Sequence, residues 1–348
     1  MLKAVQSLFA STPTLKSNEI DGVLVSTNEN SKYLAAEISE SLGIRPKHAH
    51  TVENLCSSGS NAIVSAYAYI RAGLADMIMV IGADESNGPG QVLDADISRG
   101  RFSHPIYWAS LFTASYKRRY GINAEHIATV SAKNHMHAKD NPLALYSKEY
   151  SVTDILESKE ITSDIHLYEC SRICTGASAV LLASQNMIKR LECKNPAWIT
   201  GVGGETDSAS VSHIWDFSSL HSASVAAHDA MNMAKISPDD IDVAEVHDAF
   251  AICEPMALEA VKMADRGRGV ELSNELYTTR NKMINPRGGL IGSGHPIGAT
   301  GVAQMAEITA QVTGSAGLRQ VQGARIGLVQ NMSAAATSST VLVLNCEL

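Results

Sequence analysis

The sequence predicts an α/β protein made of two similar halves, and three observations support this prediction. Short apolar runs alternate with alanine-rich helical patterns along the 348 residues, which is typical of stacked β–α units. Hydrophobic residues make up 45% of the chain and charged residues 18%, which is enough apolar material for a buried core. The order of elements in the first half returns in the second, and the length suits roughly two domains.

The first half begins with a predicted strand at 20–26, followed by a helix at 56–70 and a strand at 77–82. The segment 77–82, MIMVIG, is wholly apolar, as expected of a strand that is covered on both faces. Few positions of the helix are polar on any side, so we expect it to be buried all round. A strand pattern resumes at 177–183.

The second half repeats this order with a helix at 223–235, a strand at 242–247, a glycine-rich loop at 288–298, a helix at 299–312 and a strand at 324–329. The segments SNEID and SPDDID match, and ADMIMVIGA matches ARIGLVQNM. We therefore expect a duplicated domain whose halves face each other across a pseudo-twofold axis. In such a pair, the N-termini of two helices converge on the interface.

We expect the halves to span residues 1–190 and 191–348, with an insertion at about 87–165 that covers a site. In the second half a strand at 198–203 precedes the first helix, and its counterpart would lie before Met1. We therefore expect the first strand of the N-terminal half to be missing. We interpret it as an interior strand, whose loss leaves unpaired backbone groups, and favour a truncated or misassigned start.

The composition limits the partners and the cellular compartment that we expect. Lys and Arg number 28 and Asp and Glu 36, for a net charge of −8, which argues against nucleic acid or an anionic membrane as partner. The six cysteines lack disulfide-framework spacing, which favours reduced thiols in the cytoplasm. The longest uncharged stretch, 326–346, contains too many polar residues to cross a membrane.

Cys56 is the first candidate for chemistry, in the sequence ENLCSSG between a strand and a helix. Free N–H groups and the positive end of the dipole at a helix N-terminus favour a thiolate, so we expect a lowered thiol pKa. The small residues that follow let a substrate approach. The alternative is a buried structural cysteine in a small-residue turn.

His295 lies in GGLIGSGHPIGATG, where Gly294 and the other glycines indicate a tight, approachable backbone. A histidine there can accept the proton of a cysteine and donate to an oxyanion. His247 opens HDAF at a strand end, where α/β proteins place functional residues. The segment 330–336, QNMSAAA, offers a backbone N–H. Each feature has a structural alternative. His295 would be a capping histidine, HDAF an ordinary polar segment after a strand, and 330–336 a turn that only packs.

Together these four loops resemble those of the thiolase family over nearly the whole chain. The C-S-S-G loop and the G-H-P-I-G-A-T-G loop, far apart but at repeat-equivalent points, are the most specific part. The H-D-A-F segment is more similar to archaeal and sterol-carrier-type thiolases than to bacterial biosynthetic ones. The resemblance implies the thiolase fold, in which the two halves stack in αβαβα layers with a loop-domain insertion.

The resemblance also implies roles for individual residues. Cys56 would be the acyl-accepting nucleophile, and His295 would activate it. His295 and a water held by His247 would form one oxyanion hole, and the backbone N–H groups of Cys56 and Ser333 a second. Asn331, like Gly294, belongs to a supporting loop.

The implied activity is that of an acyl-CoA C-acetyltransferase that makes or cleaves a 3-ketoacyl-CoA, such as acetoacetyl-CoA, by Claisen chemistry in lipid metabolism. Coenzyme A thioesters would be substrates, with no further cofactor and no metal. The resemblance implies a homodimer or homotetramer. It also suggests two partners, a small zinc-ribbon/OB-fold acyl-CoA-binding protein and a hydroxymethylglutaryl-CoA synthase.

One departure from the family pattern leaves the α-proton base open. Typical thiolases carry a second cysteine where this chain has Asn331, and sterol-carrier-type enzymes carry it where this chain has Ala249. Cys253 lies nearby, but no spacing argument turns it inward. The alternative is therefore a catalytically impaired or partner-dependent acyl-CoA-binding subunit. A ketoacyl-synthase-type condensing enzyme is a third possibility, which the Gly-His-Pro loop disfavours.

Two other patterns are weaker. His166, Cys170 and Cys174 share helix-like spacing that would suit zinc, although no fourth ligand is evident. The basic run at 117–119 would suit the phosphates of coenzyme A, but a solvated helix face explains it equally well.

Overall fold

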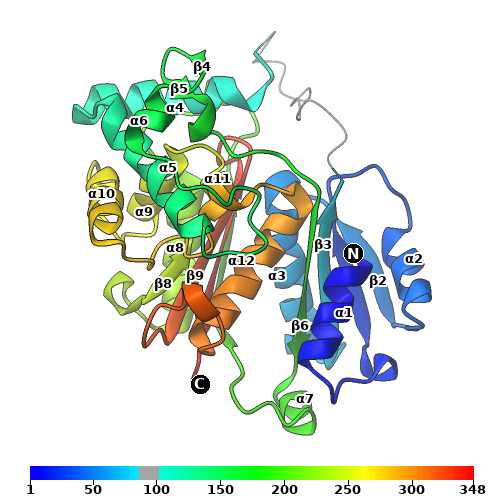
Figure 1. Ribbon diagram of the computed structural model, residues 1–348. Coiled ribbons are helices and arrows are strands. Elements are labelled where there is room, and N and C mark those ends of the chain that lie inside the picture. The colour runs from blue at the N-terminus through cyan, green and yellow to red at the C-terminus, as the bar shows by residue number, and fades with distance from the viewer. Residues whose placement is uncertain (86–101) are drawn as a thin grey trace.

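The computed structural model describes residues 1–85 and 102–348, which form two halves that lie side by side (Figure 1). The sheet of the first half contains, in spatial order, β2 (His48–Val52), β1 (Gly22–Ser26), β3 (Met77–Asp84) and β6 (Gly176–Ala183). The strand β1 pairs in parallel with both of its neighbours, whereas β6 runs antiparallel to β3. Every residue of β1 is buried, as its apolar sequence predicts.

The sheet of the second half contains, in spatial order, β7 (Trp198–Thr206), β10 (Ser338–Asn345), β9 (Ile326–Ser333) and β8 (Val243–Glu245). The strands β8 and β9 are parallel, and β10 is antiparallel to both of its neighbours. The strand β10 was not predicted from the sequence. The predicted end of β9 was also too early, because Gln330 to Ser333 continue that strand.

Helices complete five layers. The helices α3 (Ser58–Arg71) and α12 (Ile297–Val312) form the middle layer, and α12 packs against strands of both sheets (Figure 1). The helices α1 (Leu2–Ser11) and α2 (Leu34–Ser41) cover the outer face of the first sheet, and α8 (His221–Ala234) packs on the second. This arrangement confirms the αβαβα fold expected from the sequence.

The duplication is visible in a matched pair of hydrogen bonds. The carboxylate of Asp21 accepts two consecutive backbone N–H groups at the start of β3. The carboxylate of Asp242 accepts the two equivalent N–H groups at the start of β9. Each aspartate follows a short 3-10 turn, η1 (Ser17–Glu19) or η6 (Pro238–Asp240). The repeated SNEID and SPDDID segments therefore have the same structural task.

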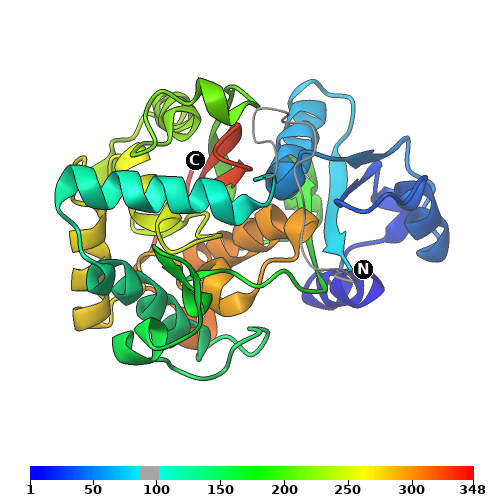
Figure 2. The ribbon, with the colours of Figure 1, turned by 90° about the horizontal axis from the view of Figure 1, so that it is seen from above.

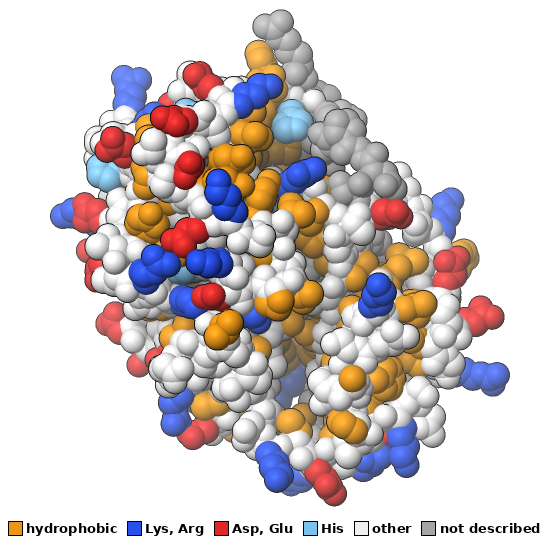
Figure 3. Space-filling model, viewed as in Figure 1, with side chains coloured by type: hydrophobic (Ala, Val, Ile, Leu, Met, Phe, Trp, Pro, Cys, Tyr) orange, Lys and Arg blue, Asp and Glu red, His pale blue; other side chains and the backbone are white. Residues whose placement is uncertain are grey.

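The interpretation of the missing strand as interior is wrong. Among the described residues of the second half, β7 is an edge strand that pairs with β10 alone. A counterpart in the first half would lie beside β6, also at an edge. The strands β1 and β3 pair directly with each other, so no interior partner is lacking. Figure 3 shows hydrophobic side chains gathered over the part of this half where β6 and α1 lie.

The two central helices meet at glycines. A Cβ atom added to Gly59 of α3 would lie 2.8 Å from the backbone nitrogen of Val302 in α12. A Cβ added to Gly301 of α12 would collide with the backbone nitrogen of Ser60. The N-terminal ends of both helices therefore approach backbone to backbone, as the repeat predicts. The expectation that α3 is buried all round is wrong, because its C-terminal half reaches the surface and Ala68 is exposed.

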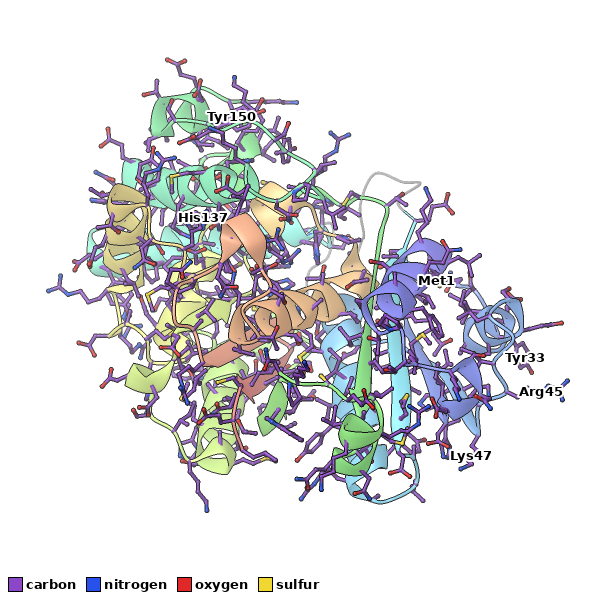
Figure 4. The ribbon with its side chains drawn as sticks, turned by 60° about the horizontal axis from the view of Figure 1, so that its bottom comes forward. Met1, Tyr33, Arg45, Lys47, His137 and Tyr150 are labelled. Carbon is purple, nitrogen blue, oxygen red and sulfur yellow. The ribbon has the colours of Figure 1, made fainter. Side chains whose placement is uncertain are left out.

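The described part of the insertion covers the second half. It contains α4 (Pro105–Tyr120), α5 (Ala124–Ala138), α6 (Val152–Leu156), β4 (Glu160–Thr162) and β5 (Ile165–His166). Seen from above, α4 lies across the second half (Figure 2). The side chains of His137 and Tyr150 lie on this side, and Met1 and Tyr33 lie on the other half (Figure 4).

Four further helices lie in the second half and in the link to it: α7 (Gln185–Arg190), α9 (Cys253–Ala260), α10 (Gly269–Thr279) and α11 (Gly289–Ser293). The helix α5 of the insertion packs against α10 and α11, so the insertion contacts the segment that leads to His295. Within the described ranges, no helix has both the length and the apolar character needed to cross a bilayer.

Candidate active site

Cys56 lies in the 3-10 turn η2 (Leu55–Ser57), directly before α3. Its sulfur is 3.4 Å from Nε2 of His295, so the structure brings together the two residues that the sequence pairs. Burial raises the pKa of the Cys56 thiol to about 12, although the backbone N–H groups of Ala334 and of Cys56 itself donate toward the sulfur. The expectation of a lowered pKa is therefore wrong, because the cost of desolvating a thiolate exceeds what these donors supply.

His295 lies between α11 and α12 and is 4% exposed. Its Nδ1 is 2.7 Å from the hydroxyl of Thr300, which donates its own proton to the carbonyl of Pro296. The Nδ1–H group of the imidazole therefore donates to Thr300, which leaves the lone pair of Nε2 facing Cys56. Burial, helped by the nearby Arg287 cation, lowers the pKa of His295 to about 3. The thiol and the imidazole thus meet as neutral partners.

His247 completes the group. Its ring stands almost perpendicular to that of His295, at 82° with centroids 5.3 Å apart. Burial, with His295 and Arg287, lowers the pKa of His247 well below its usual value. The Cys56 sulfur and one ring nitrogen from each of His247 and His295 all lie within 4.8 Å of one another. A neutral thiol beside two neutral imidazoles suits proton transfer during nucleophilic attack.

The loop that carries His295 is held from behind by Asp248, a role that sequence analysis missed. The Asp248 carboxylate accepts the backbone N–H groups of Leu290 and Ile291 and the side-chain amide of Asn134. Its position next to His247 in HDAF was the available signal. Gly294 has φ +93°, and a Cβ there would lie 2.7 Å from the sulfur of Cys174, so this position requires glycine.

The backbone N–H group that faces Cys56 comes from Ala334, one residue after the expected Ser333. Ser333 is still part of β9, where it is paired with Ser338 of β10. The chain turns only at Ala334, whose φ is +50°. The N–H group of Ala334 is the one that points at the sulfur of Cys56. Sequence patterns did not reveal this, because the end of β9 was placed too early.

Asn331 lies within the strand β9 rather than in a supporting loop, and its side chain contacts His247. Its Nδ2 is 3.2 Å from Nδ1 of His247. Cys253 lies in the hydrophobic core and is 0% exposed, and Cys174 packs behind Gly294. In the described ranges, no second thiol joins the Cys56 cluster.

The weaker sequence candidates lie elsewhere. The Nδ1 atom of His166 pairs with Glu169, and the thiol of Cys170 donates to the carbonyl of His166. Among the described residues, only the Cys56 cluster gathers three metal-binding donor atoms. In the basic run, Lys117 pairs with Asp164 and Arg119 with Asp216. Neither pattern contributes a side chain to the Cys56 cluster.

Two family models match the chain, one described as the thiolase N-terminal domain over residues 2–91 and one as thiolase C-terminal domain-like over residues 203–346. An acetyl-CoA acetyltransferase of Methanothermobacter thermautotrophicus is 30% identical over 319 residues, which cover 89% of this chain and 83% of that protein. Sterol carrier protein 2 of Oryctolagus cuniculus is 31% identical over 320 residues and 85% of this chain.

The chain spans 58% of the length of that sterol carrier protein. Among solved structures, one described as the Ltp2-ChsH2(DUF35) aldolase matches with a TM-score of 0.85 at 20% identity. The match covers 98% of this chain and 90% of that one. At this identity the match shows a shared fold.

Proposed function

Because the chain belongs to the thiolase family, we propose that it transfers acyl groups between coenzyme A thioesters through an acyl-enzyme formed on Cys56. The observation that carries this proposal is the 3.4 Å contact between the Cys56 sulfur and Nε2 of His295. That distance suits transfer of the thiol proton to the imidazole as the sulfur attacks a carbonyl carbon.

The first half-reaction follows from this geometry. The sulfur of Cys56 forms a bond to the thioester carbon while Nε2 of His295 accepts the thiol proton. The N–H groups of Cys56 and Ala334 surround the sulfur and are suited to hold the developing oxyanion, at about 3 kcal/mol for one such donor. When the intermediate collapses, the bond to the sulfur of coenzyme A breaks, and the imidazolium returns its proton to that sulfur.

In the second half-reaction the acyl group leaves Cys56 for a new acceptor. When the acceptor is the carbanion of acetyl-CoA, the new carbon–carbon bond gives a 3-ketoacyl-CoA. In the reverse direction Cys56 attacks the 3-keto carbon of a 3-ketoacyl-CoA, the carbon–carbon bond breaks, and the acetyl-CoA carbanion that leaves takes up a proton. A coenzyme A thiol then takes the acyl group from Cys56. Acetyl-CoA and acetoacetyl-CoA are our proposed substrates, with no further cofactor or metal, and the similarity to the archaeal acetyl-CoA acetyltransferase supports this choice. Cytoplasmic location, a homodimer or homotetramer, and a hydroxymethylglutaryl-CoA synthase partner remain predictions.

A partner-dependent subunit is the second candidate function. It is favoured by Asn331 and Ala249, which stand where the family pattern places a second cysteine, so no thiol is available there to remove the α-proton. A fold neighbour whose description names a DUF35 component supports the proposal of a partner protein. The proposed partner would enable the carbon–carbon bond formation that follows acylation of Cys56.

Turnover of acetoacetyl-CoA with free coenzyme A tests the proposal, with acetyl-CoA measured by chromatography. We expect product from the wild type and none from Cys56→Ala, while Cys193→Ala, which changes an exposed cysteine, keeps full activity. Turnover only after addition of a zinc-ribbon/OB-fold protein would support the second function. Absence of product under both conditions would contradict both functions.

A further inference from the structure

His247 and His295 both lie beside Cys56, and their hydrogen-bond partners, Asn331 for His247 and Thr300 for His295, favour opposite tautomers of the two rings. We infer that Asn331 is a positioning residue that holds His247 with its proton on Nε2, so that His247 acts as a hydrogen-bond donor while His295 acts as the base. The inference deepens the proposed function and rests on it for its catalytic consequence. The tautomer itself can be tested independently.

A chain of amides fixes the direction of each hydrogen bond. The backbone carbonyl of Gln330 can only accept, so Nε2 of Gln304, 3.3 Å away, donates to it. The Oε1 atom of Gln304 therefore faces Asn331 and accepts from Nδ2 of Asn331 at 2.8 Å. The other hydrogen on that Nδ2 points at Nδ1 of His247, at 3.2 Å. The ring nitrogen Nδ1 must then carry the lone pair, which places the proton of the neutral imidazole on Nε2.

Burial makes this arrangement rigid. Gln304, Asn331 and Gln330 are 0% exposed and His247 is 2% exposed, so water cannot substitute for a partner. The hydroxyl of Ser60 lies 3.1 Å from Oδ1 of Asn331 and adds a contact from α3. Asn331 is therefore tied to both central helices, through Ser60 of α3 and Gln304 of α12. Reversing its amide would place like groups against each other at Gln304.

His295 has the opposite tautomer, so the two histidines can play different roles, His295 as the base and His247 as a hydrogen-bond donor. Nδ1–H of His295 donates to Thr300, so its Nε2 is free to take the thiol proton. With the proton on Nε2, His247 has a donor available on its other side for a substrate oxygen that gains negative charge. Asn331 thus acts through His247 and does not itself exchange protons.

The same tautomer opposes metal binding. Cysteine and histidine donors within 4.8 Å of one another suit zinc, but a protonated Nε2 has no lone pair for a metal. Asn331→Asp replaces the donor to Nδ1 with an acceptor. The carboxylate would draw the proton to Nδ1 and free Nε2, as carboxylates do behind histidines that bind zinc. The substitution should therefore reverse the tautomer and create a zinc site.

Nitrogen-15 NMR of the full chain labelled on histidine tests the tautomer, with His247→Gln identifying the resonances of that ring. We expect Nε2 of His247 to be protonated in the wild type and Nδ1 in Asn331→Asp, with His295 unchanged in both. If Asn331→Asp does not fold, Asn331→Leu serves, and we expect a mixture of tautomers. A wild-type His247 protonated on Nδ1, or an unchanged tautomer in a folded variant, would overturn the inference.

Titration with zinc alone, in competition with a chelator, gives a second readout that does not depend on activity. We expect Asn331→Asp to bind one zinc ion at least tenfold more tightly than the wild type, and Cys56→Ala in that background to abolish the gain. Equal affinity in the wild type and the folded Asn331→Asp would contradict the inference. If the tautomers are as stated but Cys56 takes no acyl group, the proposed function fails and this inference stands.

The kinetics of acyl transfer test the catalytic consequence of the inference. In Asn331→Asp we expect kcat to fall ten- to a hundredfold with little change in KM, because the lost donor acts on the developing charge rather than on substrate binding. A rise in KM at unchanged kcat would contradict a role of Asn331 through His247.

Discussion

Gly59 and Gly301 lie where α3 and α12 cross, and each leaves room for the backbone of the other helix. Gly59 lies three residues after Cys56, and Gly301 lies six residues after His295. The close approach of the two helices therefore sets the distance between the sulfur and the imidazole. The same helix–helix contact therefore holds the two halves together and positions the active site.

Gly59→Ala should push the central helices apart. The added Cβ would lie 2.8 Å from the Val302 nitrogen and 3.1 Å from the Gly298 carbonyl oxygen, both backbone atoms. We expect a loss of about 1–3 kcal/mol in the free energy of unfolding and slower acylation of Cys56. Urea unfolding and intact-mass kinetics measure the two effects. Gly204→Ala is the control, since a Cβ there meets only the Ser339 carbonyl oxygen at 3.9 Å. Equal effects of the two variants would contradict the close approach.

The raised pKa of Cys56 should be visible in alkylation by iodoacetamide. Its thiol pKa lies well above neutral pH, so the thiolate fraction rises about tenfold for each pH unit until the pKa is approached. We expect the alkylation rate at Cys56, followed by peptide mass, to increase steadily from pH 7 to pH 9. A rate that levels off below pH 8 would show a preformed thiolate–imidazolium pair instead.

Thr300→Val should disable the base while keeping the shape of the side chain. Without the hydroxyl, Nδ1–H of His295 loses its acceptor, and the proton can move to Nε2, where it blocks the approach of the thiol. We expect acylation to slow by about ten- to a hundredfold and stability to fall by about 1–3 kcal/mol. Thr309→Val, at a half-buried position further along α12, should leave acylation unchanged. An unaffected rate in Thr300→Val would exclude the assigned tautomer of His295.

Asp248→Ala should loosen the loop that carries His295. Two backbone N–H groups and the Asn134 amide would lose their buried acceptor, at about 1–3 kcal/mol each. Asp248→Asn keeps one side-chain oxygen that can accept the Leu290 N–H group, so it should cost less than Asp248→Ala. Thermal unfolding measures the order, with the exposed Asp239→Ala as control. Equal stability of Asp248→Ala and Asp239→Ala would refute the anchoring role.

The sequence was sufficient to predict the fold and the pairing of Cys56 with His295. Both residues lie at repeat-equivalent ends of helices, and duplicated halves bring such positions together. It did not reveal β10 or the exact turn at Ala334, because uncharged residues continue without a break from β9 onward. The direction of the Cys56 pKa shift depends on how much water the folded site excludes, and sequence patterns carry no measure of that.

The roles of Asn331 and Asp248 were not predicted, although the position of Asp248 beside His247 marks it as a residue near the site. Each acts through a hydrogen bond to a distant segment, Asn331 to His247 and Asp248 to the loop before His295. Motif spacing shows which residues accompany the nucleophile, but it does not show which atom of a side chain faces which neighbour. For Asn331 that detail decides the tautomer of His247.

The central claim is that Cys56 accepts an acyl group with His295 as the base, and intact-mass analysis after incubation with acetyl-CoA tests it most directly. The account predicts one added acetyl group on the wild type, located on the peptide that contains Cys56. It predicts none on Cys56→Ala and a much slower gain on His295→Ala. A folded wild type that stays unmodified, or an acetyl group that persists on Cys56→Ala, would contradict it.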